Sequence, residues 1–193
     1  MELNKEKELE KNLKVYRTKL TEILGQENSQ LLIRCLVCCE FGKRLLAKAE
    51  QELNEINNQV EVAAAKQYPK DTEYNIIGVV NQYIKALRRY TERTEPGEKF
   101  KAFSLMKICE KSIYANYGEK EAEQIVGYAI QKDAVLANVS SLKSSVDVQQ
   151  QLIKKITNKN KAASFYAGKY VSTYYELDDL RKQNLICQRE RTK

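Results

Sequence analysis

Histidine and tryptophan are absent from these 193 residues. Without histidine the chain cannot form a Ser-His-Asp or Cys-His catalytic group, a Glu-x-x-His di-iron site, or a zinc site with histidine ligands. The sequence also contains no Walker A loop and no Gly-x-Gly-x-x-Gly motif, so a standard nucleotide-binding cradle is not indicated. These absences favour a protein that is not an enzyme, and no cofactor is predicted.

Proline and glycine are scarce, with two and seven residues respectively, so few breaks are imposed on the chain. This composition favours long helices over many short strands. No apolar run reaches the roughly 18 residues of a membrane-spanning helix. The charged N-terminal sequence MELNKEKELEKNLK lacks the apolar core of a signal peptide. We therefore expect a cytoplasmic protein without a membrane partner, whose five cysteines are reduced thiols.

The longest regular stretch, residues 31–67, contains no proline and has one apolar stripe, here called the central seam. Its members recur in alternating steps of three and four residues, the period of a helix in coiled-coil-like packing. They are Leu32, Cys35, Cys39, Gly42, Leu46, Ala49, Leu53, Ile56, Val60 and Ala63. A helix of this length extends roughly 55 Å at 1.5 Å per residue. Its single apolar stripe must lie against other helices.

Similar patterns predict further helices over residues 2–24, 72–93, 95–117, 119–157 and 162–187. The expected fold is all-α, an elongated antiparallel bundle of five to six helices with coiled-coil-like seams in a single domain, 1–193. Within it we expect a helical hairpin over 1–67, a basic hairpin over 72–117 and long C-terminal helices over 119–188. The serine pairs at 140–141 and 144–145 could divide the helix over 119–157.

Capping residues place the helix ends in this prediction. Gly25 suits the C-cap of the first helix, and Asn28 or Ser29 suits the N-cap of the long helix. So short a link predicts that these two helices are antiparallel neighbours. Thr72 and Thr94 are the expected N-caps of the next two helices, and residues 157–161 are the expected loop before the last one.

The sequence Cys35-x-x-Cys38-Cys39 raises the possibility of a metal or redox site. Cys35 and Cys39 share the central seam, whereas Cys38 lies about 100° from Cys39 around the helix. Only Cys109 and Cys187, from two other helices, could complete a four-cysteine site. The favoured interpretation is that Cys35, Cys39 and Gly42 are small packing residues that let helices approach closely.

The net charge of +7 is unevenly distributed along the chain. Residues 69–118 carry nine basic and six acidic residues, and residues 158–193 carry eight basic and four acidic residues. The other segments are balanced. These two segments are therefore where an anionic partner would touch the protein.

Candidate nucleic-acid-binding residues follow from these two segments. Lys85, Arg89 and Arg93 recur every four residues and form one row on the predicted helix. The remaining candidates in the first segment are Arg88, Lys99, Lys101, Lys107 and Lys111, with Tyr90 and Phe100 available for base stacking. The alternative is a solvated helix face whose charge is offset by Glu92, Glu95, Glu98 and Glu110.

The second basic segment adds Lys159, Lys161 and Lys169 beside the aromatic residues Phe165, Tyr166, Tyr170, Tyr174 and Tyr175. Tyr166 and Tyr170 fall in the core register of the helix. Tyr174 and Tyr175 are adjacent, so at least one of them must point away from the core. An exposed tyrosine near lysines suits RNA stacking and a protein interface equally.

The function predicted from these features is a non-catalytic helical protein that binds RNA or DNA or serves as a small subunit of a nucleic-acid complex. The alternative is a protein-interaction or scaffold subunit whose seams pair with another protein or with a second copy in a homodimer. A third hypothesis is a bundle that encloses a cofactor through its cysteines. Basic helical bundles recur in ribonucleoprotein complexes, but that is an analogy of class only.

Overall fold

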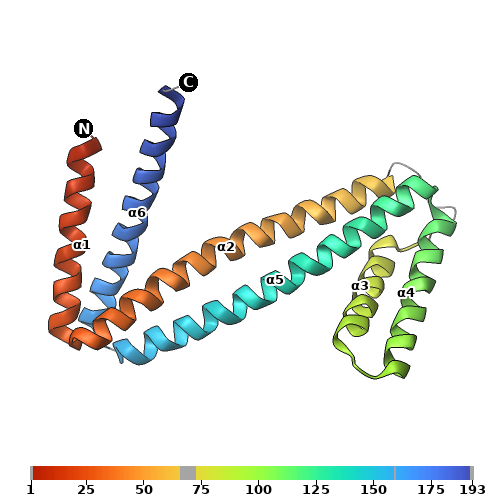
Figure 1. Ribbon diagram of the computed structural model, residues 1–193, viewed down its shortest axis with the longest axis horizontal. Coiled ribbons are helices and arrows are strands. Elements are labelled where there is room, and N and C mark those ends of the chain that lie inside the picture. Colours follow the sequence, from red (N-terminus) through yellow and green to blue (C-terminus); the bar gives the residue numbers. More distant parts are fainter. Residues whose placement is uncertain (1, 66–72, 159, 192–193) are drawn as a thin grey trace. The chain divides into compact units, whose positions relative to one another are not determined.

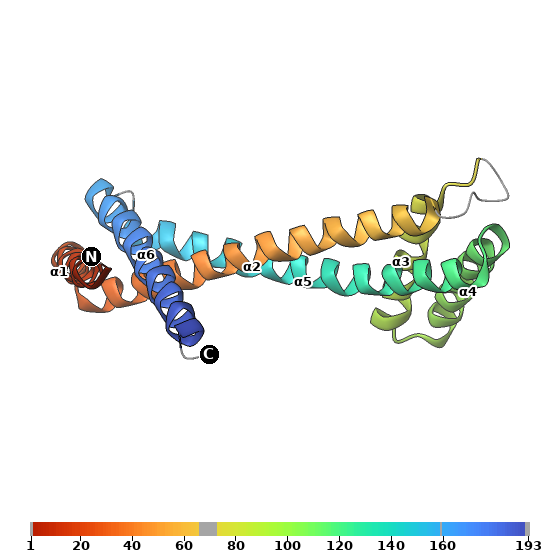
Figure 2. The same ribbon diagram turned by 90° about the horizontal axis from the view of Figure 1, so that it is seen from above.

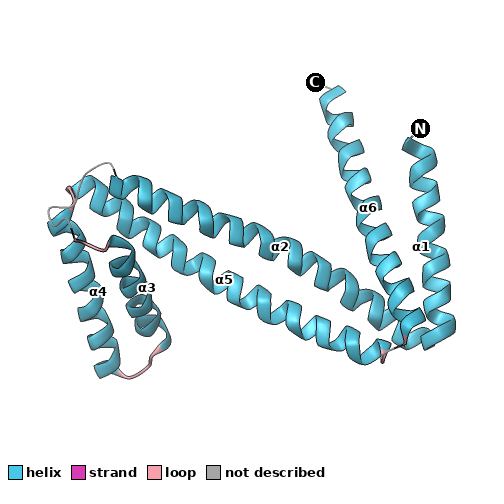
Figure 3. Cartoon of the chain, turned by 180° about the vertical axis from the view of Figure 1, so that it is seen from behind, coloured by secondary structure: helices cyan, strands magenta, loops and turns pink. Residues whose placement is uncertain are grey.

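The computed structural model describes residues 2–65, 73–158 and 160–191, with side chains described from residue 4 to residue 186. The described residues form six helices and no strand (Figures 1 and 3). They are α1 (Glu2–Leu24), α2 (Gln26–Ala65), α3 (Ile76–Glu92), α4 (Pro96–Asn116), α5 (Glu119–Thr157) and α6 (Lys161–Arg191). The predicted all-α bundle is confirmed. No described helix is both long enough and apolar enough to cross a membrane.

Contacts divide the chain into two compact units. Unit 1 comprises residues 1–45 and 142–193, and unit 2 comprises residues 46–141. Helices α2 and α5 each contribute residues to both units. Each unit has buried apolar residues of its own. The single domain over residues 1–193 stays a prediction.

In unit 1, α1 lies antiparallel beside α6, and the first part of α2 lies beside the last part of α5 (Figures 1 and 2). Leu20 of α1, Leu32 of α2 and Ala167 of α6 form a buried cluster, against which Ile153 and Ile156 of α5 pack. Four helices therefore share one core, because each directs an apolar stripe toward the others.

The link between α1 and α2 is shorter than predicted. Gly25 alone separates the helices, with a φ of 78°, and its carbonyl accepts a hydrogen bond from the amide of Ser29. Ser29 is therefore not the N-cap but a buried residue of the first turn of α2, with its hydroxyl 3.0 Å from that of Thr21. Helix α1 packs along α6, and Leu20 of α1 also contacts the cluster that contains Leu32 of α2; that α1 and α2 form a hairpin stays a prediction.

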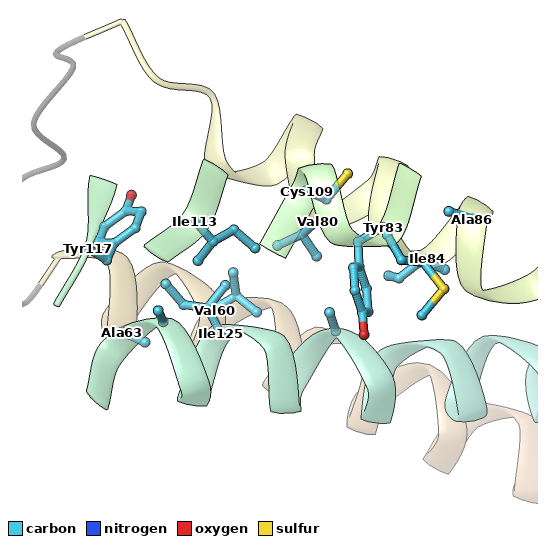
Figure 4. Packing of buried hydrophobic residues seen from close by; sticks show 13 residues of the cluster. Val60, Ala63, Val80, Tyr83, Ile84, Ala86, Cys109, Ile113, Tyr117 and Ile125 are labelled. Atoms are coloured by element: carbon cyan, nitrogen blue, oxygen red, sulfur yellow. The ribbon is translucent and has the colours of Figure 1, made fainter. Parts of the chain in front are cut away.

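Unit 2 is built around the antiparallel hairpin of α3 and α4, which packs against the parts of α2 and α5 that belong to this unit. Figure 4 shows the buried residues that meet between these helices. Val60 and Ala63 come from α2, Val80 and Tyr83 from α3, Cys109 and Ile113 from α4, and Ile125 from α5. Burial of Ile113 and Ile125 is complete. This core fixes the faces that α3 and α4 turn outward.

Two helix starts in unit 2 differ from the prediction. Helix α3 begins at Ile76, where the side chain of Asn75 accepts a hydrogen bond from the Gly78 amide at 2.8 Å. The predicted cap, Thr72, lies outside the described residues. Helix α4 begins at Pro96 with Glu95 as N-cap, and not with Thr94, and the Glu95 side chain makes no capping hydrogen bond.

The ten members of the central seam are all buried or half-buried in α2, as the period predicted. In unit 1 the seam meets α5 so closely that a Cβ at Gly42 would lie 2.9 Å from Cγ2 of Val146.

Helix α5 is continuous through both serine pairs. It ends at Thr157 and is followed by Asn158, which has a φ of 42°. The Asn160 side chain caps α6 by accepting a hydrogen bond from the Ala163 amide at 3.0 Å.

Candidate nucleic-acid interface

The basic row on α3 faces solvent. Lys85 and Arg89 lie on the exposed face of α3, because Val80, Tyr83 and Ile84 turn the opposite face of the helix into the core. Arg93 is also exposed, but it is the C-cap of α3 and has extended backbone, so the predicted helical row ends at Arg89. None of the three forms an ion pair with a described residue. Arg89 and Arg93 lie near Glu98, whose pKa is lowered mainly by Lys101 and in smaller part by these two arginines. The positive charge of these residues is therefore only partly compensated by carboxylates of the protein.

The outer face of α4 carries both aromatic and lysine side chains. Phe100, Phe103, Lys107, Lys111 and Tyr114 follow one another in steps of three and four, so they share one face. That face lies opposite the buried face formed by Ala102, Met106, Cys109 and Ile113. Phe100 is 71% exposed, Phe103 42% and Tyr114 41%. Such an exposed aromatic face on a helix is uncommon when it has no partner.

Rings and cations from the two helices meet near the link between α3 and α4. The ring centroids of Tyr90 and Phe103 are 6.1 Å apart at an interplanar angle of 44°. Lys99 Nζ lies 5.9 Å from the Tyr90 centroid, and Lys107 Nζ lies 5.6 Å from the Phe103 centroid. We call this surface the hairpin patch. It comprises Lys85, Arg89, Tyr90, Arg93, Lys99, Phe100, Phe103, Lys107, Lys111 and Tyr114.

Three of the predicted binding residues have partners within unit 2. Arg88 is half-buried and pairs through Nε with Asp133 of α5 at 2.5 Å. Lys101 pairs with Glu98 at 3.0 Å, and Lys107 pairs with Glu110 at 2.6 Å. Arg88 therefore holds α3 to α5, and this placement favours a structural role over contact with a ligand.

The C-terminal candidates lie in unit 1 and form a separate group. Lys161 and Lys169 are exposed on α6, and Lys169 Nζ lies 5.8 Å from the ring centroid of Phe165, which is 58% exposed. Lys159 lies outside the described residues. The exposed aromatic side chain near these lysines is thus Phe165.

The two adjacent tyrosines of α6 are both held by the protein. Tyr175 is buried, and its hydroxyl donates to the carbonyl of Val37 at 2.8 Å. Tyr174 is half-buried and stacks on Tyr170 with 6.5 Å between ring centroids. Neither tyrosine offers an open ring face of the kind that Phe165 or Phe100 presents.

The cysteines of the central seam are packed in the interior. Cys35 and Cys39 are buried, as is Cys109 of α4, whereas Cys38 is exposed. Burial raises the pKa of each of the three buried thiols, which therefore stay protonated at neutral pH. The side chain of Cys187 lies outside the described part. Within that part, no three His, Cys, Asp or Glu side chains are grouped so that they could hold a metal ion.

Sequence reasoning missed Phe103 and Tyr114, although their spacing from Phe100 was available to it. Read with Lys107 and Lys111, this spacing predicts one mixed aromatic and basic face once the core face of α4 is known. The proximity of Phe103 to Tyr90 could not be found in this way, because it depends on the geometry of the hairpin.

Comparison with known proteins gives no relative: no family model, no curated protein and no solved structure matches this chain.

Proposed function

We propose that this protein is a non-catalytic helical protein of the cytoplasm that binds single-stranded nucleic acid through the hairpin patch. The observation that carries the proposal is the grouping of exposed rings with cations in the hairpin patch. On α4, Phe100 and Phe103 precede Lys107 and Lys111, and Tyr114 follows them. Arg89 of α3 and Arg93, the C-cap of α3, add positive charge that no ion pair with a described residue offsets.

The chemistry of single strands explains why this combination is suitable. Bases of a single strand have free faces, and stacking on an aromatic side chain contributes about 1–3 kcal/mol per base. Phosphates are bound through charge along the same path, with release of counterions. A surface that carries both rings and cations can contact the bases and the phosphates of one strand at the same time. Duplex DNA hides its base faces, so we expect it to bind more weakly.

Five cations of the patch form no ion pair with a described residue: Lys85, Arg89, Arg93, Lys99 and Lys111. If each contacts one phosphate of a single strand, the slope of log Kobs against log salt is roughly −3.5, since each contact contributes about −0.7. Raising salt fourfold then weakens binding by roughly a hundredfold.

The test is fluorescence anisotropy with labelled single-stranded RNA, single-stranded DNA and duplex DNA at low salt. Arg89→Gln combined with Arg93→Gln removes two exposed charges without touching the core. Lys7→Gln combined with Lys11→Gln on exposed positions of α1 changes the net charge equally and serves as the control. Weaker binding in the arginine variant, with unchanged binding in the lysine control, supports the proposal. Equal binding in both variants and the wild type contradicts it.

Phe100→Ala tests the stacking component separately. The Phe100 side chain is 71% exposed, so its removal leaves the core intact. We expect weaker binding with an unchanged salt slope, because a ring is lost and no charge is. An unchanged affinity would mean that the rings do not take part.

A second candidate function is that of a protein-interaction subunit, and the exposed apolar side chains of α4 favour it. Ile108 is 62% exposed and lies beside the aromatic face. A partner helix or a second copy that covers Phe100 and Ile108 would give a complex that resists salt, since apolar burial is not screened. Analytical ultracentrifugation at low and high salt distinguishes it from nucleic-acid binding.

A further inference from the structure

Two of the hollows in unit 1 have different charge properties. The larger, about 590 Å³, is lined by residues of α1, α2 and α6 that include Arg44 and Asp179. These two form an ion pair at 3.1 Å, and Lys5 pairs with Glu176 at 3.0 Å on the same surface. Its cations are therefore already matched by carboxylates and leave no excess charge for a ligand.

The smaller hollow, about 270 Å³, is lined by Arg17, Gln30, Ile33, Arg34 and Tyr170. Three helices contribute to it, since Arg17 belongs to α1, Gln30 and Arg34 to α2, and Tyr170 to α6. No carboxylate lines it. Neither Arg17 nor Arg34 forms an ion pair with a described residue, so two guanidinium groups adjoin one hollow without a counter-charge.

We propose that this hollow is a binding site for a phosphate group, in which Arg17 and Arg34 bind the oxygens from two helices. Guanidinium groups suit phosphate because their planar donors form paired, charge-assisted hydrogen bonds. Gln30, one turn before Arg34, adds a neutral amide donor. The proposal does not depend on the hairpin patch, which lies in unit 2.

Tyr170 adds a hydroxyl donor to the proposed site, and the packing of its ring holds that hydroxyl in place. Burial raises the pKa of Tyr170, although the charge of Arg17 acts in the opposite direction, so the hydroxyl keeps its proton at neutral pH and can donate. The ring stacks on Tyr174 at an interplanar angle of 16°, which limits the movement of the hydroxyl. Tyr170 also packs against the buried cluster of Leu20, Leu32 and Ala167. The site thus combines a packed aromatic wall with two exposed arginines.

The hollow is small, with a volume of about 270 Å³. It accommodates a phosphate group and a small attached moiety but falls below the range of sites that enclose drug-sized ligands. The chemical class is therefore a phosphomonoester, which can be the terminal phosphate of a nucleic acid or a small phosphorylated metabolite.

The test uses the full chain and follows the arginine Nε–H resonances by NMR during titration with inorganic phosphate, against sodium chloride at equal ionic strength. We expect saturable shifts of Arg17 and Arg34 with phosphate and not with chloride. Arg17→Gln combined with Arg34→Gln should weaken binding at least roughly tenfold, equivalent to about 1.4 kcal/mol. Lys7→Gln combined with Lys11→Gln is the charge-matched control and should bind as the wild type does.

Tyr170→Phe removes one hydroxyl and preserves the ring, so it separates a donor role from a packing role. We expect weaker phosphate binding with an unchanged circular dichroism spectrum. Two further titrations identify the source of the phosphate. A single strand with a 5′-phosphate is compared with the same strand lacking it, and glucose 6-phosphate is compared with glucose.

Tighter binding of the phosphorylated member of either pair, lost in the double arginine variant, supports the site and identifies which kind of phosphomonoester it takes. Shifts that are equal in phosphate and chloride, or binding that survives the loss of both arginines, would overturn the proposal. Single-strand binding that depends on Arg89 and Arg93 would be unaffected by this result, so the two proposals fail separately.

Discussion

Gly42 offers the sharpest test of how the helices of unit 1 pack. A Cβ at this position would lie 2.9 Å from Cγ2 of Val146, a distance that real Cβ contacts do not show. Val146 is 6% exposed and β-branched, so its side chain cannot easily turn away. Gly42→Ala therefore combines two opposing effects, the helix preference of alanine and the overpacking of the interface.

The magnitudes of these two effects predict the outcome. Replacing glycine by alanine inside a helix stabilises by about 1 kcal/mol, and overpacking costs about 1–3 kcal/mol. The net change is therefore a loss of about 0–2 kcal/mol. Gly168→Ala in α6 is the matched control, because a Cβ there meets no atom within 4 Å. It should gain up to about 1 kcal/mol.

A double-mutant cycle identifies the clash as the cause. Val146→Ala removes the methyl group that blocks the new Cβ, so Gly42→Ala in that background should stabilise by about 1 kcal/mol. The assay is urea unfolding followed by helical circular dichroism. If Gly42→Ala and Gly168→Ala stabilise the wild type equally, the close approach of α2 and α5 at Val146 is refuted.

Three further predictions concern single interactions. Arg88→Gln leaves the largely buried carboxylate of Asp133 unpaired and should cost about 1–3 kcal/mol of unfolding free energy, measured by urea unfolding. Burial raises the pKa of Tyr83 to about 12, so the folded state holds this proton more tightly than the unfolded state does, and stability should fall between about pH 10 and 12. Tyr83→Phe should remove this part of the decline in a series of unfolding curves at rising pH; an unchanged decline would contradict it. Asn160→Ala removes the side-chain acceptor of the Ala163 amide at the start of α6 and should cost about 1 kcal/mol, whereas Asn160→Asp should restore most of it. Thermal unfolding of the two variants checks this.

The helices were predictable because the apolar period is a local property. Each member of the central seam, from Leu32 to Ala63, is buried or half-buried in α2. Helix ends were less predictable, because several residues of similar capping preference compete. At the start of α2 the positive φ of Gly25 lets the helix begin at once, so Ser29 lies inside it.

The candidate sites were predictable only in part. The exposure of Lys85 and Arg89 on one face of α3 followed from spacing alone, whereas Arg93 lies beyond the end of the helix. The role of Arg88 did not, because its partner Asp133 is 45 residues away in sequence. The hollow beside Arg17, Arg34 and Tyr170 was invisible to charge counting, since residues 1–27 and 28–68 each sum to zero. Whether a charged side chain forms an ion pair within the protein depends on tertiary contacts, which the sequence pattern does not show.

The most direct test of the proposed function is the salt dependence of single-strand binding to the wild type and to the Arg89→Gln, Arg93→Gln variant. The account predicts a slope of log Kobs against log salt of roughly −3.5 for the wild type and roughly −2 for the variant, since two phosphate contacts of about −0.7 each are lost. No binding at low salt, or the same slope in both proteins, would contradict it.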